Sequence, residues 1–204
     1  MINAEVISHK IGDYLEKELL LDSKRKSIIV YGLFSIIQIG ISLLLTIILG
    51  IATNTLQEAL IITFVIVMLR KYTGGAHAET PNKCLITGLI VTIIPAFIIN
   101  RLVYLGSLKL VIISTIIIYL VAFVLILKNA PVDNKNKRIK SDKKRKRLKK
   151  SSIVILIMYI ISSTILGVLF LRYGNVDMLK YISSISYGVL WQVFTLTNFS
   201  AKII

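Results

Sequence analysis

The sequence predicts an all-α integral membrane protein with six transmembrane helices and an N-terminal interfacial amphipathic helix. Of the 204 residues, 55% are hydrophobic and 17% are charged. Uncharged runs cover 27–57, 84–100, 110–127, 151–171 and 181–201, and most match the roughly 20 residues that a helix needs to cross a bilayer. The runs are Ile- and Leu-rich blocks without the alternation of barrel strands, so only helices satisfy their backbone in lipid.

Residues 2–21 form a different kind of segment. Their apolar side chains fall on one side of a helix and their charged side chains on the other, which is typical of a helix that lies in the membrane interface. Several acidic residues and a broken apolar core argue against a cleaved signal peptide. His9 fits a polar interfacial position in this helix.

The first apolar run is too long for one span, and Gly50 followed by Thr53, Asn54 and Thr55 supplies turn signals that divide it. The expected spans are 28–51, 56–70, 85–100, 108–127, 152–171 and 179–198. We expect residues 1–204 to form a single polytopic membrane domain. Its named parts are the interfacial helix 2–21, a catalytic stretch 69–86 and a cytoplasmic polybasic loop 128–150.

The distribution of Lys and Arg predicts the orientation of the chain. Five lie in the N-terminal segment, three in the stretch 69–86 and twelve in the loop 128–150, whereas the alternate loops hold between none and two. By the positive-inside rule both termini, the stretch 69–86 and the basic loop are cytoplasmic.

The loop 128–150 accounts for most of the net charge of +15. It has no aromatic residues for base stacking and it is tethered between two spans, so we expect anionic lipid head groups as its partner and no nucleic acid. Gly32, Gly40 and Ser42 in the first span fit close helix packing, either with a second copy in a homo-oligomer or within one bundle.

The stretch 69–86, LRKYTGGAHAETPNKCLI, holds the only cysteine, Cys84, and one of two histidines, His77. Cys84 follows Pro81, which suits the first turn of a helix. The positive end of the helix dipole would favour the thiolate, the nucleophilic form. His77 is the candidate general base, because a turn through Pro81 would let it fold back onto Cys84. The alternative is a polar cytoplasmic turn.

The spacing of Arg70, Gly74, Gly75, His77 and Cys84 resembles the motif of the AgrB family, the accessory gene regulator B membrane peptidases of Gram-positive quorum sensing. The six-span frame of about 200 residues is similar to that family over nearly the whole chain. The resemblance implies a multi-pass protein of the bacterial cell membrane.

The resemblance also implies an activity. It is that of a cysteine endopeptidase that removes the C-terminal part of a short AgrD-like propeptide, needs no cofactor or metal, and keeps the acyl group on Cys84 as a thioester. His77 would take the thiol proton and pass it to the leaving amine. An internal Cys or Ser of the propeptide would then close a thiolactone or lactone ring, the autoinducing peptide.

The other motif residues keep two interpretations each. Arg70 would pair with a substrate carboxylate or mark the cytoplasmic end of its helix. Gly74 and Gly75 would position N–H donors for an oxyanion or only permit the turn. Glu79 fits a solvated loop better than a third catalytic role.

Three other classes of protein are alternatives to a peptidase. A small transporter is hinted at by Glu58 and by Pro95 within a span. A metal site would combine His77, Cys84 and Glu79 with His9. A membrane scaffold without chemistry is the third.

Overall fold

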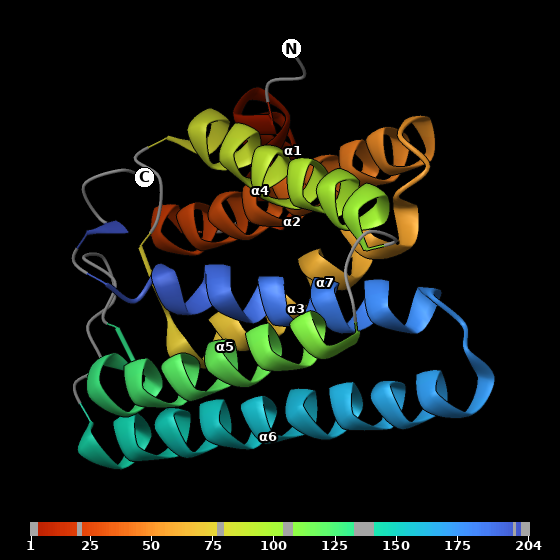
Figure 1. Ribbon diagram of the computed structural model, residues 1–204. Coiled ribbons are helices and arrows are strands. Elements are labelled where there is room, and N and C mark those ends of the chain that lie inside the picture. The colour runs from red at the N-terminus through yellow and green to blue at the C-terminus, as the bar shows by residue number, and fades with distance from the viewer. Residues whose placement is uncertain are drawn as a thin grey trace. The chain divides into compact units, whose positions relative to one another are not determined.

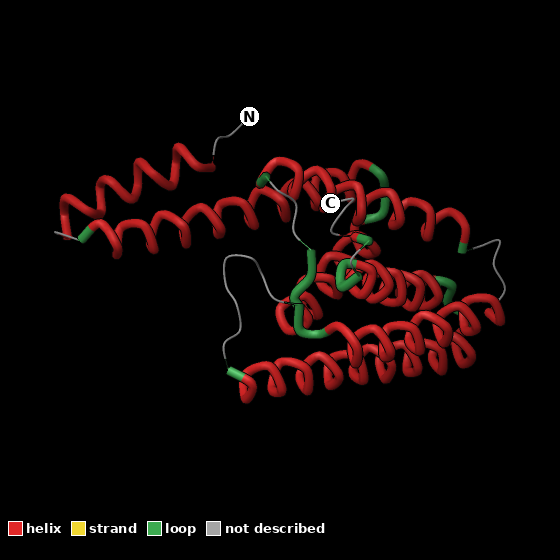
Figure 2. Tube along the Cα trace, turned by 90° about the vertical axis from the view of Figure 1, so that its left-hand side faces the viewer, coloured by secondary structure: helices red, strands yellow, loops and turns green. Residues whose placement is uncertain are grey.

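The computed structural model describes residues 4–19, 22–76, 80–103, 108–132, 141–197 and 199–200. Throughout these residues the secondary structure is α-helix joined by short loops, without a strand (Figure 2). The all-α fold class is therefore confirmed. The chain divides into two compact units, Met1–Leu45 and Thr46–Ile204.

The first unit is a helical hairpin. It contains α1 (Ala4–Leu19) and most of α2 (Ser23–Ala52). The Lys26 ammonium lies 2.8 Å from an Asp13 carboxylate oxygen and 2.6 Å from one of Glu16, so α1 folds back along the start of α2 (Figure 2). The apolar residues Ile7 and Tyr14 of α1 are exposed, as the predicted interfacial helix requires.

The second unit holds the remaining helices. They are α3 (Leu56–Thr73), α4 (Pro81–Leu102), α5 (Leu108–Asn129), α6 (Asp142–Tyr173) and α7 (Asp177–Phe194). Helix α7 packs against each of the other four, and α5 and α6 run alongside one another (Figure 1). Helices α3 and α7 are therefore central, and α4, α5 and α6 surround them.

The core of this unit is made by aliphatic and aromatic side chains from α3, α5, α6 and α7. Its fully buried members include Leu69, Ile126, Leu156 and Val189. Gly188 lets α7 approach α3 closely, because a Cβ there would lie 2.8 Å from Val65 Cγ1 and 3.3 Å from the Ile62 carbonyl oxygen. Small residues at such contacts are the usual means of close helix packing in membranes.

Hydrogen bonds between helices add to this packing. The Tyr119 hydroxyl of α5 lies 2.6 Å from Ser163 Oγ of α6, and Thr115 Oγ1 of α5 lies 3.0 Å from Ser186 Oγ of α7. Such pairs satisfy hydroxyl groups that would otherwise be buried without partners.

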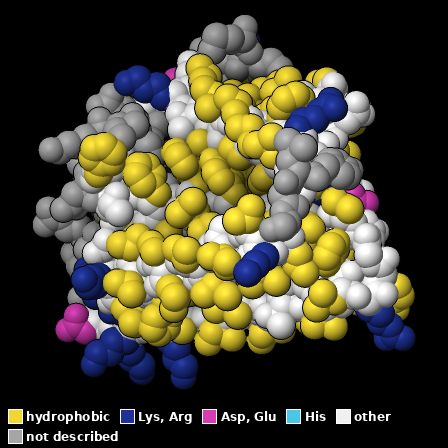
Figure 3. Space-filling view, viewed as in Figure 1, with side chains coloured by type: hydrophobic (Ala, Val, Ile, Leu, Met, Phe, Trp, Pro, Cys, Tyr) yellow, Lys and Arg dark blue, Asp and Glu magenta, His cyan; other side chains and the backbone are white. Residues whose placement is uncertain are grey.

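Four of the described helices, α2, α4, α5 and α6, are long and apolar enough to cross a membrane. Hydrophobic side chains cover the face formed by α5 and α6, and Lys and Arg side chains gather near its edges (Figure 3). Helices α3 and α7 are not among these four, so the structure supports a membrane protein but does not confirm six transmembrane helices. Both are central, and polar residues such as Glu58 and Gln192 are buried there against protein.

Helix α6 differs most from the expected spans. It begins at Asp142 rather than at 152, so the second part of the expected loop 128–150 is helical. Lys, Arg and Leu are good helix formers, and Asp142 in the first turn complements the helix dipole. Lys149 Nζ donates a hydrogen bond of 2.5 Å to the Leu127 carbonyl oxygen, which joins the basic part of α6 to the end of α5.

Candidate active site

The double glycine ends α3 and turns the chain. Gly74 caps the helix with a φ of 68°, and its N–H donates to the Arg70 carbonyl oxygen at 2.9 Å. Gly75 follows with a φ of 142°. Residues with a side chain rarely adopt these values, so glycine suits both positions.

Neighbouring backbone and side chains also leave no room for a side chain at this turn. A Cβ on Gly74 would collide with the carbonyl oxygen of Val132, whose N–H donates to the Thr73 carbonyl oxygen at 2.9 Å. A Cβ on Gly75 would collide with Thr195 Oγ1 and come within 3.2 Å of Thr195 Cβ. The turn is thus held between the end of α7 and the segment that follows α5.

Gln192 of α7 binds the same turn from within the protein. Its side chain is fully buried, and Nε2 donates to Thr73 Oγ1 at 2.9 Å and to the Gly74 carbonyl oxygen at 2.8 Å. The sequence interpretation missed Gln192, Thr195 and Val132. A strongly polar amide between Trp191 and Val193, inside an apolar run, was an available signal, because such a group is costly in a bilayer unless it is bonded.

Arg70 binds the turn as well. Its Nη2 donates to the carbonyl oxygen of Ala76, the residue before His77. The Ala76 N–H donates to the Thr195 carbonyl oxygen at 2.9 Å. Arg70 also interacts electrostatically with Cys84, so one guanidinium lies close to both parts of the motif.

Cys84 lies in the first turn of α4, as predicted. Thr80 is the N-cap, Pro81 is the first helical residue, and Thr80 Oγ1 accepts from the Lys83 N–H at 3.3 Å. The Cys84 N–H donates to the Thr80 carbonyl oxygen at 3.0 Å. The thiol is free and the residue is exposed, so a substrate can reach it at the positive end of the helix dipole.

His77 and Glu79 lie outside the described residues. The structure therefore defines the two ends of the short segment that carries them, Ala76 and Thr80. Within the described part of the chain, no three His, Cys, Asp or Glu side chains are grouped as metal ligands. His77 and Glu79 are two of the four residues that the sequence offers as ligands of a metal site.

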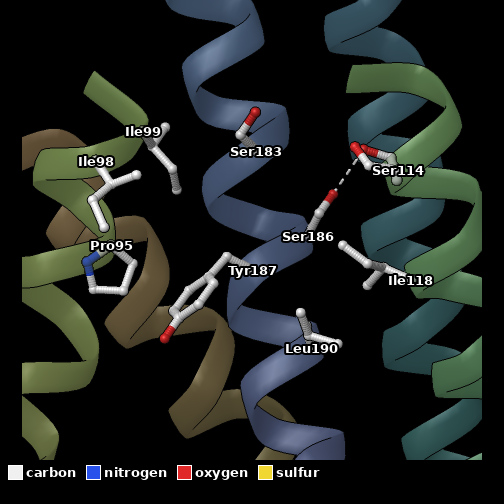
Figure 4. Close-up of a pocket in the computed structure, with 10 residues that line it drawn as sticks. Pro95, Ile98, Ile99, Ser114, Ile118, Ser183, Ser186, Tyr187 and Leu190 are labelled. Carbon is white, nitrogen blue, oxygen red and sulfur yellow. Dashed lines mark hydrogen bonds between the residues drawn. The ribbon is translucent and has the colours of Figure 1, made fainter. Parts of the chain in front are cut away.

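A hollow of about 250 Å³ opens between α4, α5 and α7. Pro95, Ile98 and Leu190 line it together with the hydroxyl-bearing residues Ser183 and Tyr187 (Figure 4). Pro95 follows Cys84 on α4 at a distance of about 16 Å along the helix axis, at 1.5 Å per residue. The hollow is therefore separate from the thiol.

The two features that hinted at a transporter lie at the same distant end of α4. Glu58, in the first turn of α3, is buried and accepts a hydrogen bond of 2.7 Å from Asn100 Nδ2. That pairing gives the buried carboxylate a structural role where α3 and α4 meet.

Comparison with known proteins identifies the family. The model of the family Accessory gene regulator B matches residues 8–196. The chain belongs to the AgrB family. It is 40% identical over 194 residues to AgrB-like protein 2 of Clostridium perfringens strain 13, covering 95% of this chain and 91% of that protein. An AgrB-like protein of Clostridium perfringens strain SM101 is 37% identical over the same shares of both chains. No solved structure matches the chain.

Membership of the AgrB family confirms the resemblance seen in the motif. The family is related to the processing of quorum-sensing peptides, and it implies an AgrD-like propeptide as the general substrate. All five motif residues, Arg70, Gly74, Gly75, His77 and Cys84, lie inside the matched range.

The AgrB motif turn offers few free N–H donors for a developing oxyanion. The N–H groups of Gly74, Ala76 and Cys84 donate to backbone carbonyl oxygens. The Gly75 N–H makes no hydrogen bond to a residue that the structure describes. Of the two motif glycines, only Gly75 therefore has an N–H without a partner in the described part of the chain.

Proposed function

We propose that this AgrB chain is a membrane-embedded cysteine endopeptidase that cleaves the C-terminal part of an AgrD-like propeptide and allows the remainder to cyclise. One observation carries the proposal. The only thiol of the chain is exposed in the first turn of α4, within electrostatic range of Arg70, and Arg70 binds the turn that leads into His77. The described part of the motif thus contains a nucleophile, Cys84, a cation, Arg70, and Ala76, the residue that precedes the proposed base His77.

In the proposed reaction Cys84 Sγ attacks the carbonyl carbon of the scissile peptide bond while His77 accepts the thiol proton. The Gly75 N–H is the candidate donor to the oxyanion of the tetrahedral intermediate. The C–N bond then breaks, His77 gives the proton to the leaving amine, and the acyl group stays on Cys84 as a thioester.

Ring closure completes the cycle. An internal Cys or Ser of the propeptide gives its proton to His77 and attacks the thioester carbonyl carbon. The C–S bond to Cys84 breaks, and His77 passes that proton to the Cys84 sulfur. The product is a cyclic thiolactone or lactone. Exclusion of water by the bound propeptide would protect the acyl-enzyme from hydrolysis to a free acid.

The proposed topology has six crossings, with α3 and α7 as internal spans. Each has 18 residues, which is about 27 Å at 1.5 Å per residue and close to the thickness of the hydrocarbon core. Their polar side chains are tolerable because α4, α5 and α6 surround them. The basic start of α6 and the motif turn lie at one end of the second unit, which supports a cytoplasmic position for both.

Labelling of the thiol tests this topology. Because Cys84 is the only cysteine, a membrane-impermeant maleimide reports on one position. We expect no labelling of intact cells and full labelling of inside-out vesicles or permeabilised cells. Labelling of intact cells would place Cys84 outside and overturn the topology. Cys84→Ser, which has no thiol, measures the background labelling.

A cleavage assay tests the activity itself. Purified wild-type protein in lipid vesicles is incubated with the propeptide encoded beside its gene, and mass spectrometry follows the loss of the C-terminal part. We expect a shortened, cyclised product at the same rate with and without a chelator. Loss of activity in the chelator would favour a metal site, and an intact propeptide would favour a scaffold or a transporter.

A further inference from the structure

The contacts of Gln192 extend the site to α7. Its amide orientation is fixed by chemistry, because the Gly74 carbonyl oxygen, 2.8 Å away, only accepts hydrogen bonds and must face Nε2. The opposite atom, Oε1, is buried and has no hydrogen-bond partner among the residues that the structure describes. The two donors of Nε2 therefore bind the turn, while the amide oxygen is left unsatisfied.

Four backbone groups of the turn are held by three residues, Arg70 of α3, Gln192 of α7 and Thr195 just after α7. The Gly74 N–H binds the end of α3, and the Gly74 carbonyl oxygen binds Gln192. The Ala76 N–H binds the Thr195 carbonyl oxygen, and the Ala76 carbonyl oxygen binds Arg70. The backbone conformation of residues 74–76, which lead to His77, is thus determined by α3 and α7 together.

We expect the fold to tolerate loss of the Gln192 amide, because the single Thr73 hydroxyl proton can turn to the Gly74 carbonyl oxygen instead of the Leu69 carbonyl oxygen. The Gly74 carbonyl oxygen has a second donor in Thr73 Oγ1, at 3.1 Å, and Thr73 Oγ1 also lies 3.0 Å from the Leu69 carbonyl oxygen. A methionine at 192 has a similar length and would remove the unsatisfied Oε1, which is unfavourable when buried. An apolar side chain at position 192 would therefore pack as well as glutamine does.

We propose that Gln192 is a positioning residue of the AgrB reaction. By holding the Gly74 carbonyl oxygen it fixes the turn through Gly75 and so the approach of His77 to Cys84 and of the Gly75 N–H to the substrate. This inference rests on the proposed endopeptidase function. The inference states that the hydrogen bonds donated by the Gln192 amide increase the rate of the reaction and contribute little to the free energy of unfolding.

The test compares Gln192→Met with wild type in vesicles, measuring kcat, KM and the thermal unfolding temperature. We expect a fall in kcat of about tenfold or more, because displaced reacting groups lower the rate steeply, with KM and the unfolding temperature unchanged or the latter raised. Ser184→Ala is the matched control, since it also removes a buried and unsatisfied polar atom of α7, two helical turns from Gln192. We expect wild-type values for it.

Other outcomes separate the two proposals. If wild type cuts the propeptide, Cys84→Ala does not, and Gln192→Met has the wild-type kcat, the positioning role is wrong and the peptidase stands. If wild type does not cut, the proposed function itself fails. Gln192→Asn, which keeps the amide but shortens its reach, replaces Gln192→Met if the latter does not accumulate. Failure of both variants to fold would show a structural role and overturn the inference.

Discussion

Replacing Cys84 by alanine is expected to abolish propeptide cleavage, with a loss of at least about 10³-fold, because removal of the nucleophile leaves no covalent route. His77→Ala should lose about 10²- to 10⁴-fold, the usual contribution of a general acid–base. Co-expression with the propeptide, followed by mass spectrometry of the peptide and immunoblotting of the membrane fraction, measures both losses against the amount of protein present.

The exposure of Cys84 makes this comparison interpretable. Its side chain lies at the surface, so alanine there should leave the unfolding temperature within the range of ordinary surface substitutions. Ser183→Ala, in the hollow far from the thiol, is a control that should cut normally. Cleavage that survives in Cys84→Ala would contradict the assignment of the nucleophile, and 69–86 would then be a polar turn.

Alanine at Gly74 is expected to cause the second large effect, a loss of both stability and activity. Gly74 has a φ of 68° and a ψ of −151°, a region that is nearly restricted to glycine and costs a residue with a Cβ about 1–3 kcal/mol. The collision with the Val132 carbonyl oxygen adds to this because backbone cannot move aside easily. Together we expect about 2–4 kcal/mol of destabilisation, seen as a lower unfolding temperature in detergent, and cleavage near background.

Gly174→Ala is the control for this prediction. Gly174 caps α6 with a φ of 65° and a ψ of 12°, the left-handed region, and a Cβ there would meet nothing within 4 Å. Alanine at 174 should show only the smaller cost of that region and retain full activity. Equal behaviour of the two variants would mean that neither the backbone conformation of Gly74 nor its contact with Val132 has an added energetic consequence, and the description of a tightly held turn would be wrong.

The sequence predicted the position of Cys84 because local signals determine it. Pro81 fits only the first turn of a helix, and Thr80 before it is a favoured N-cap. The end of α3 at the double glycine follows from the same kind of local chemistry. Periodicity and hydropathy likewise located the apolar helices, and the family resemblance carried the motif as a whole.

Long-range contacts escaped prediction. Gln192 lies more than a hundred positions after Thr73, and their hydrogen bond depends on how α7 packs beside α3. The close approach of Val132 to Gly74 has the same origin. The hydropathy pattern also treated α3 and α7 like the other spans, although both lie inside a layer of more apolar helices, where burial against protein relaxes the need for hydrophobic side chains.

The buried centre has a consequence for the site. The motif turn is attached to α3 and α7, which are packed on several sides, and the thiol is on α4, whose outer face is apolar and exposed. A propeptide at this site would therefore meet a thiol on an outer helix and a turn that hydrogen bonds attach to α3 and α7. Rigid support of this kind is what catalytic geometry requires.

Detection of the acyl-enzyme tests the central claim most directly. Wild-type protein is incubated with a propeptide whose internal Cys or Ser is replaced by alanine, so that ring closure is blocked, and its intact mass is measured. The account predicts an added mass equal to the propeptide without its C-terminal part, located on Cys84, released by hydroxylamine and absent from Cys84→Ala. Cleavage of this propeptide without any adduct, or an adduct on another residue, would contradict a thioester at Cys84.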